Sequence, residues 1–252
     1  MRSVKRALQI MEILASSDNN GLGVTRLSQD LNLDKSTVYR LLSTLGTCGY
    51  VEQEPETKKY NLSLKIVELS NKVLDKIELG KTARPFMKEL VQRLNEAAHL
   101  AILVEKKVIY IGYEGTFSVI SIKTEVGKEA PGYCTAVGKV LWAYLPEEEL
   151  DEILQTERLT QLTPRTITSP SELKMHLRNV REKGYAFDDE EFAVGVRCVA
   201  VPVWENKGKV IASFGISALA TRITLDRIEE VAKVIKKVRD KLCPKLGWRG
   251  RD

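Results

Sequence analysis

The sequence predicts a two-domain α+β protein, in which a small helical domain with a short hairpin precedes a larger antiparallel sheet flanked by helices. Three observations support this fold class. Hydrophobic residues recur at helical spacing through most of the first 50 residues. From residue 99 the pattern changes to paired runs rich in Ile, Val and Tyr. At 252 residues the chain is also long enough to form two hydrophobic cores.

The N-terminal part is predicted to fold as three helices. The first covers Val4–Ala15, with Ser3 as its cap, and completes the core of the small domain. We expect its buried side to carry Ala7, Leu8, Met11, Leu14 and Ala15. The second covers Val24–Leu31, and Asn32-Leu33 forms the elbow that leads to the third.

The third helix has one apolar and one polar face. Val38, Leu41, Leu42 and Leu45 follow the i, i+3, i+4, i+7 spacing of a buried stripe. Asp34 precedes the helix as a candidate N-cap and Gly49 follows it as a candidate C′ residue. On the opposite face lie the polar residues Ser36, Tyr39, Arg40, Ser43 and Thr47.

Two short helices joined by such an elbow form the helix-turn-helix arrangement, whose second helix enters the major groove of DNA. Arg40 is suited to guanine O6 and N7, and Tyr39 to a phosphate or to stacking. The candidate DNA-binding residues are Lys35, Ser36, Thr37, Tyr39, Arg40, Ser43, Lys58 and Lys59. The alternatives are a helical hairpin with a solvated polar face and a module that binds a protein.

A hairpin follows the third helix. Tyr50–Gln53 and Lys58–Leu62 are its expected strands, and Glu54-Pro55-Glu56-Thr57 is its turn. This hairpin is placed like the wing of a winged helix-turn-helix domain. The chain has a net charge of +5, but residues 1–63 carry eight Lys and Arg against seven Asp and Glu. Affinity for double-stranded DNA must therefore depend on the placement of cations and on pairing two copies.

The rest of the chain alternates between helix and strand patterns. A linker helix is expected over Leu64–Leu79, with a break at Gly80, and another helix from Thr82 to Asn95. Residues 99–115 read as a hairpin around Glu105-Lys106-Lys107, and Val119–Thr124 as a third strand. The later helices are expected at Thr135–Leu145, Glu147–Gln155, Ser171–Lys183 and from a cap at Thr224 to Leu242. The later strands are expected at Tyr185–Asp188, Val196–Val203 and Val210–Ser217.

Composition excludes several classes of protein. With 43% hydrophobic and 29% charged residues the chain is typical of globular proteins, and no apolar run approaches the roughly 20 residues of a membrane span. The four cysteines are dispersed without a CxxC pair, which favours reduced thiols in the cytoplasm over a disulfide framework. With only His99 and His176 as imidazole ligands, we expect no metal and no cofactor.

The competing class is an enzyme. Cys134 or Cys198 with His99 could in principle form a nucleophile and its base. The chain has no nucleophile elbow, Walker loop or dinucleotide fingerprint. We therefore expect no enzymatic activity and assign no catalytic residue.

Three blocks of sequence, in this order and spacing, resemble the isocitrate lyase regulator (IclR) family of transcription regulators over almost the whole chain. They are VKRALQIMEILA with LDKSTVYRLLSTL, then GYCTAVGKVLWAYLP, and then KGYAFDDEEFAVGVRCVAVPV with IASFGIS. The resemblance implies a winged helix-turn-helix domain over residues 1–63, a linker helix over 64–80 and a GAF-like effector-binding domain over 81–252. It also implies a homodimer or homotetramer, and repression as the commoner mode of control.

The resemblance further implies a pocket for a small organic-acid effector. Ala136 and Val137 would present backbone amides at a helix start, which agrees with the electropositive character of helix N-termini. Asp188 and Cys198 would flank the ligand and Ser217 would donate a hydroxyl. The apolar wall would consist of Val119, Ile122, Ala130 and Val196.

Several of these residues have an ordinary structural interpretation as well. Many relatives have a serine where this chain has Gly215, so we expect space and one hydroxyl fewer at that position of the pocket. Asp188 could belong to a solvated acidic turn, and Cys198 could be a plain core thiol. His99 is expected to be structural.

Overall fold

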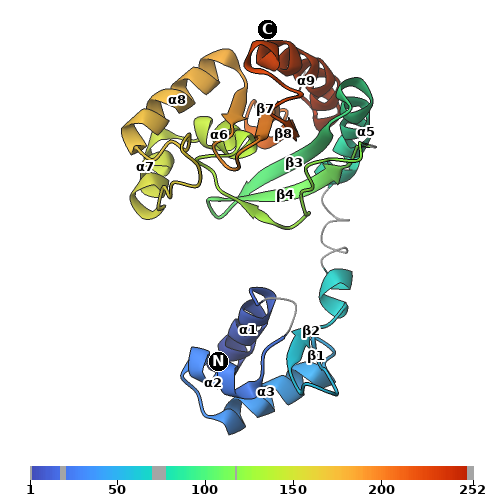
Figure 1. Ribbon diagram of the computed structural model, residues 1–252, viewed down its shortest axis with the longest axis vertical. Coiled ribbons are helices and arrows are strands. Elements are labelled where there is room, and N and C mark those ends of the chain that lie inside the picture. The colour runs from blue at the N-terminus through green and yellow to red at the C-terminus, as the bar shows by residue number, and fades with distance from the viewer. Residues whose placement is uncertain (1, 18–20, 70–77, 117, 249–252) are drawn as a thin grey trace. The chain divides into compact units, whose positions relative to one another are not determined.

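A computed structural model describes residues 2–17, 21–69, 78–116 and 118–248 of the chain. The chain divides into two compact units, residues 1–76 and 77–252, which are coloured from blue to cyan and from green to red in Figure 1. The linker predicted over residues 64–80 spans this division. Within it, residues 65–69 are helical, whereas residues 70–77 lie outside the described residues.

The N-terminal unit consists of three helices and one hairpin. The helices are α1 (Arg2–Ala15), α2 (Val24–Leu31) and α3 (Lys35–Thr47), and the strands are β1 (Val51–Gln53) and β2 (Tyr60–Leu62). Leu22 joins the hairpin through two backbone hydrogen bonds with Tyr60, of 3.0 and 2.9 Å. All five elements contribute to one core, made of Ile10, Leu14, Leu27, Val38, Leu42, Leu45, Val51 and Tyr60.

The buried side of α1 differs from the expected one. Ser3 lies inside the helix, so it is not the cap. Ile10 is fully buried, while Leu8 is 54% exposed and Ala15 is exposed. The sequence of α1 has apolar residues on more than one side, and only contact with α2 and α3 selects the side that Ile10 and Leu14 share.

The C-terminal unit is built on a six-stranded, fully antiparallel sheet with the strand order β5-β4-β3-β8-β7-β6. Its strands are β3 (Ala97–Val104), β4 (Lys107–Glu114), β5 (Glu129–Ala130), β6 (Ala186–Asp189), β7 (Val196–Trp204) and β8 (Val210–Leu219). Its helices are α5 (Glu78–Leu94), α6 (Ala136–Ala143), α7 (Glu147–Thr156), α8 (Pro170–Lys183) and α9 (Ile228–Leu242). Short 3-10 turns lie at Leu225–Arg227 and Cys243–Leu246.

Each face of this sheet is covered by its own set of helices, as Figure 1 shows. On one face, α5 and α9 pack on alternate residues of the central strands, including Val199, Val201, Phe214 and Ile216. On the other face, α6, α7 and α8 form a second core with the smaller side chains of the sheet, such as Ala200. Helices segregated on an antiparallel sheet confirm the predicted α+β class.

Two expectations for this unit are wrong. Gly80 does not end a helix, because α5 runs through both Gly80 and Pro85. Residues 119–124 form no strand, since Val119 and Ile120 project into solvent and the edge of the sheet is completed instead by Glu129–Ala130. Alternation alone indicated a strand there, but a strand also needs a partner for its backbone and a surface for one face. None of the helices in the described ranges is long and apolar enough to cross a membrane.

Candidate DNA-binding surface and ligand cavity

The elbow between α2 and α3 is fixed by local hydrogen bonds. Asn32 adopts the left-handed conformation (φ 50°), which a short polar side chain tolerates. Its amide donates to Gln29 O, and the Leu33 amide donates to Ser28 O at 3.0 Å. The Ser28 hydroxyl donates to Leu33 O at 2.7 Å. These bonds set the angle at which α3 leaves α2.

The polar face of α3 is exposed as the sequence predicts. Lys35, Ser36, Tyr39, Arg40 and Ser43 are exposed, and Thr37 is half-buried. Asp34 occupies the N-cap position but makes no side-chain capping bond, and Gly49 has the positive φ (78°) expected after the helix end. Within the described ranges, neither Lys35 nor Arg40 is held in an ion pair. Their charges therefore face outward without a counter-ion from the part of the chain that the structure describes.

The wing carries its lysines near the tip. Backbone hydrogen bonds between Glu54 and Lys58 and between Glu54 and Lys59, of 2.9 and 2.8 Å, close the turn. Lys58 is exposed and Lys59 is half-buried. The wing also exposes Glu52, Glu54 and Glu56, which agrees with the near-zero net charge of residues 1–63.

A cavity of about 110 Å³ opens between α6 and the sheet of the C-terminal unit. The structure brings together eight of the ten predicted effector-binding residues in its wall, namely Ile122, Ala130, Ala136, Val137, Asp188, Val196, Cys198 and Ser217. These residues come from four strands, one helix start and one loop. The lining also includes eight residues that sequence reasoning did not assign, which are His99, Tyr110, Lys123, Thr124, Lys128, Glu129, Thr135 and Phe192.

The other two predicted residues, Val119 and Gly215, do not line the cavity. Val119 is fully exposed in the irregular segment that was expected to be a strand. At Gly215 an added Cβ would lie 2.4 Å from Val199 O and 2.8 Å from Ala200 Cβ. The glycine is therefore required by close packing against β7, and it gives no extra space to a ligand.

Four polar side chains form a row across the floor of the cavity. Asp188, Cys198 and Ser217 are register partners on β6, β7 and β8, and His99 follows on β3. Cys198 Sγ lies 3.0 Å from Ser217 Oγ, which lies 3.3 Å from His99 Nε2. Burial lowers the pKa of His99 to about 4 and raises that of the Cys198 thiol, so both are neutral at pH 7.

Asp188 is almost completely buried in this row. Its Oδ1 accepts hydrogen bonds from the amides of Glu191 (2.7 Å) and Phe192 (3.3 Å), whereas Oδ2 has no partner among the described residues. Burial raises the pKa of Asp188 to about 7, against the opposing effects of Lys139 and of the two amides. The buried side chain can therefore hold a proton near neutral pH, unlike a residue of a solvated acidic turn.

The opposite wall is the start of α6. Thr135 caps the helix by accepting from the Gly138 amide at 3.2 Å, and its hydroxyl donates to Pro131 O at 2.6 Å. The amides of Ala136 and Val137 precede the first intrahelical bonds and are available to an anion. Lys123 and Lys128 line the same cavity with exposed side chains, and neither is ion-paired within the described ranges.

A buried ion pair lies behind the cavity. Lys139 of α6, fully buried, donates to Glu191 Oε1 at 2.5 Å. The loop that carries Glu191 is held further by Thr163 and Thr166, whose hydroxyls donate to Glu190 O and Glu191 O at 2.7 Å each. This pair fixes the loop after β6, and with it the backbone amides that bind Asp188.

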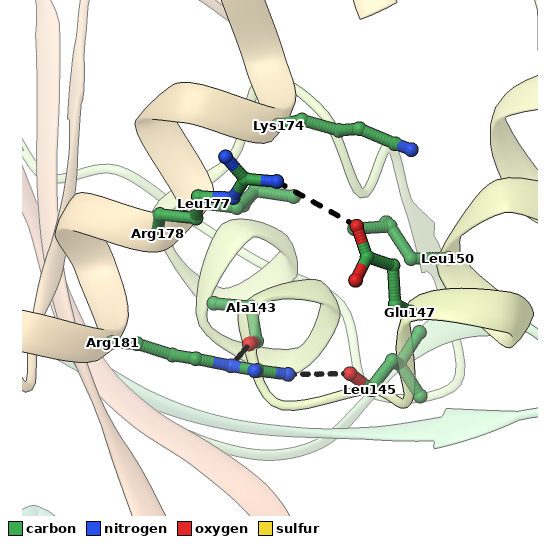
Figure 2. Close-up of a pocket in the computed structure, with 8 residues that line it drawn as sticks. All are labelled: Ala143, Leu145, Glu147, Leu150, Lys174, Leu177, Arg178 and Arg181. Carbon is green, nitrogen blue, oxygen red and sulfur yellow. Dashed lines mark hydrogen bonds and ion pairs between the residues drawn. The ribbon is translucent and has the colours of Figure 1, made fainter. Parts of the chain in front are cut away.

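A second hollow, of about 70 Å³, lies at the other end of α6 (Figure 2). Its cations have protein partners: Arg181 donates to Ala143 O and Leu145 O, and Arg178 lies 3.6 Å from Glu147. Lys174, also in the lining, forms an ion pair with Asp151. The hollow is thus largely neutralised by the protein, and Arg181 serves to cap the carbonyl end of α6. No three His, Cys, Asp or Glu side chains converge as metal ligands anywhere in the described ranges.

Two family models match consecutive parts of the chain. The IclR helix-turn-helix domain matches residues 3–55, and the bacterial transcriptional regulator IclR C-terminal domain matches residues 71–244. The chain belongs to the IclR family. It is a transcriptional regulator with a DNA-binding helix-turn-helix domain and a C-terminal effector domain, as the sequence resemblance predicts.

Individual members of the IclR family are similar over nearly the full length. The HTH-type transcriptional regulator KdgR of Escherichia coli (strain K12) is 38% identical over 247 residues, which cover 98% of this chain and 94% of KdgR. The crystal structure of the Thermotoga maritima IclR matches with a TM-score of 0.77 and 30% identity, covering 98% of this chain and all of that one. An IclR homologue from Microbacterium hydrocarbonoxydans, complexed with 4-hydroxybenzoate, has the same fold, with a TM-score of 0.78, 21% identity and 96% and 98% coverage.

Some of the eight additional lining residues could have been predicted from the sequence, and others could not. His99 and Tyr110 lie in the expected hairpin of residues 99–115, but only the order β4-β3-β8 places that hairpin beside Ser217. Thr135 could have been found, because a threonine before AVGK is a typical helix cap. Lys123 and Lys128 belong to an irregular segment whose course has no sequence signal.

Proposed function

We propose that this protein is a repressor whose binding to operator DNA is controlled by a small organic acid held in the cavity beside α6. The chemistry of the cavity wall is the observation that supports an organic acid as the ligand. Helix-start amides at Ala136 and Val137 and the cations of Lys123 and Lys128 surround one space. A carboxylate satisfies both, and the volume of about 110 Å³ is below the roughly 300–1,000 Å³ of pockets for drug-sized ligands, which favours an acid of few atoms. A homologue of the same fold binds 4-hydroxybenzoate, which is such an acid.

The operator would be read by two copies of the chain. In a dimer, two α3 helices enter successive major grooves, with Lys35, Ser36, Thr37, Tyr39, Arg40 and Ser43 toward bases and phosphates. Lys58 and Lys59 of each wing contact the DNA backbone or the minor groove. Pairing is supported by the near-zero charge of residues 1–63, because a single copy lacks a strong basic field.

The N-terminal unit also exposes apolar side chains that a second copy would cover. Val4 and Leu8 lie one turn apart on α1, with exposed fractions of 65% and 54%. Leu64, directly before the short helix at residues 65–69, is 83% exposed, and Val67 within that helix is 53% exposed. Such a concentration of exposed apolar side chains in a small unit favours self-association through this end of the chain.

Control requires that the acid bind the DNA-competent and DNA-incompetent states with different affinity. The linker of residues 64–80 connects the effector domain to the DNA-binding domain. Lys65, at the start of its helical part, donates to Cys48 O at 2.6 Å, where α3 ends. A change in the direction of the linker would therefore be transmitted to the recognition helix.

A binding experiment tests the proposal in two steps. A thermal-shift screen of the full-length protein against keto acids, sugar acids and aromatic acids should give stabilising acids, and these should change operator affinity in fluorescence anisotropy. If only apolar or cationic compounds stabilise the protein, the acid site is wrong. If acids bind but leave operator affinity unchanged, the regulatory role is wrong.

A further inference from the structure

The effector cavity adjoins an unbalanced set of buried charges. Lys139, Glu191 and Asp188 are all nearly or completely inaccessible to solvent. The single ammonium group bonds to Glu191 Oε1 at 2.5 Å. Glu191 Oε2 and Asp188 Oδ2 are buried and have no hydrogen-bond partner among the described residues. Two carboxyl groups therefore share one cation, and each has one unsatisfied oxygen.

The thiols and the phenol around Asp188 carry no charge at neutral pH. They are Cys198 on β7, Tyr110 on β4 and Cys134 before α6. Burial raises the pKa of each of them, and the nearby carboxyl group of Asp188 raises it further. These groups therefore neither balance nor add to the charge of Asp188.

Positive charge next to Asp188 comes from Lys139. His99 on β3 and His176 on α8 are neutral at pH 7, because burial lowers the pKa of each to about 4. Arg197 on β7 is buried, but its Nε donates to Asp189 Oδ1 at 2.8 Å. Arg197 and Asp189 follow directly beside Cys198 and Asp188 on their strands, so their side chains leave the opposite face of the sheet. Within the described ranges, Lys139 is thus the buried cation on the side of Asp188. The other charged residues of the cavity lining, Lys123, Lys128 and Glu129, are exposed to solvent, and Glu129 is paired with Lys107.

A bound organic acid would add a third carboxyl group to this site. An ionised Asp188, itself only 1% exposed, would then face an ionised ligand, and adjacent carboxylates with so little access to water do not both stay ionised. Oδ2 of Asp188 is the atom that lacks a partner and belongs to a residue that lines the cavity. A proton on Oδ2 would remove the repulsion and supply a donor to the ligand.

We propose that the cavity binds its organic acid together with one proton, which Asp188 holds on Oδ2 and donates in a hydrogen bond to the carboxylate of the acid. This inference rests on the proposed function, because it requires an acid in the cavity. The proton comes from solvent and adds to the Asp188 carboxylate, and no covalent bond of the ligand changes. The two backbone amides continue to donate to Oδ1. Regulation by the acid is thereby linked to pH.

The number of protons taken up on binding, and the resulting change in affinity with pH, can be calculated from the pKa of Asp188. With Asp188 half-ionised near pH 7 in the free protein, binding takes up about half a proton at pH 7 and about one at pH 8.5. If only the protonated form binds, the dissociation constant at pH 8.5 is about 30-fold higher than at pH 6. A site without this proton keeps the same affinity over that range, because simple carboxylic acids are fully ionised throughout it.

Isothermal titration calorimetry on the full-length protein tests the proposal, with acetate, lactate and 4-hydroxybenzoate as probes. Each titration is run at pH 6.0, 7.0 and 8.5 in two buffers of different ionisation enthalpy, which gives the number of protons taken up. Asp188→Asn presents an amide donor in place of the carboxyl group and should bind with no proton uptake and no pH dependence. Proton uptake by the Glu191→Gln variant shows whether Glu191, and not Asp188, holds the proton. Asp151→Asn, which changes a carboxylate paired with Lys174 of the second hollow, should keep the full linkage.

The results of these titrations distinguish failure of the proton proposal from failure of the acid site. Uptake near one proton at pH 8.5 that disappears in Asp188→Asn, with the 30-fold change in affinity, supports the proposal. Binding without proton uptake overturns it and leaves the proposed function standing. Uptake that survives in Asp188→Asn and disappears in Glu191→Gln overturns the assignment to Asp188. If no probe binds at millimolar concentrations at any pH, the acid site itself is wrong, and the proposed function is refuted together with this inference.

Discussion

Replacing Asp188 with asparagine should change the pH dependence of folding even without a ligand. Burial raises the pKa of Asp188 from 3.8 to about 7 in the folded protein. Folding therefore takes up a proton between about pH 4 and pH 7, and the wild-type protein loses stability as the pH rises through this window. At about 1.4 kcal/mol per pKa unit, the loss amounts to about 4 kcal/mol by pH 8.

The asparagine side chain of the Asp188→Asn variant has no proton to lose, and its oxygen can still accept from the amides of Glu191 and Phe192. The free energy of unfolding of Asp188→Asn minus that of the wild type should therefore rise by about 4 kcal/mol between pH 4 and pH 8. The sign is specific to a buried, desolvated carboxyl group. A carboxylate stabilised by ion pairing would give the opposite trend, because its pKa would be lowered in the folded state.

Urea denaturation followed by tryptophan fluorescence is a suitable assay. The three tryptophans of the chain, Trp142, Trp204 and Trp248, all belong to the unit of residues 77–252. The signal thus reports the unfolding of the unit that contains Asp188. Equal urea m-values for the two proteins would show that the unfolding transition is the same. A free-energy difference that stays constant within about 1 kcal/mol from pH 4 to pH 8 would refute a neutral, buried Asp188.

Three further predictions concern the DNA-binding surface and the buried ion pair. Arg40→Ala should reduce the preference for operator over random DNA by about 1–3 kcal/mol in fluorescence anisotropy; an equal loss on both DNAs would exclude a base-reading role. Lys58→Ala should lower the slope of log K against log salt by about 0.9 for each phosphate contact removed, while the preference for operator is kept, and an unchanged slope would mean that the wing does not contact phosphate. Lys139→Met should destabilise the C-terminal unit by about 3–5 kcal/mol, because it leaves Glu191 buried without a cation. The double variant Lys139→Met/Glu191→Gln should recover part of that loss in urea denaturation, and no recovery would show that the cost comes from packing alone.

Much of the fold could be predicted because it depends on local patterns. The helices α2, α3, α7 and α8 begin and end within one residue of the expected positions, since apolar periodicity and caps are properties of neighbouring residues. The predicted helix and strand boundaries are wrong where contacts with residues distant in the sequence decide the structure. Residues 119–124 have the alternation of a strand but lack one, and α5 continues through Gly80 and Pro85 because packing on the sheet outweighs weak helix propensity.

The residues of the ligand cavity also differ in how well they could be predicted. Resemblance to the family predicts Ala136, Asp188, Cys198 and Ser217 as ligand-binding residues, and they lie in the wall of one cavity. Val119 was assigned in the same way but lies in solvent. Among the strand residues, resemblance fails at Gly215, whose place in β8 is set by close packing against β7. In the irregular segment it holds for Ile122 but not for Val119, because no hydrogen-bond ladder fixes the direction of each side chain there.

By itself, the sequence determined which residues are apolar, where helices are capped, and that a polar helix face follows a tight elbow in the first 50 residues. Only the tertiary structure decided that Asp188, Cys198, Ser217 and His99 form one row, because their alignment depends on the register of four strands that are distant in the chain. It also decided the state of Asp188, since an aspartate holds a proton near neutral pH only when the rest of the fold removes water from around it.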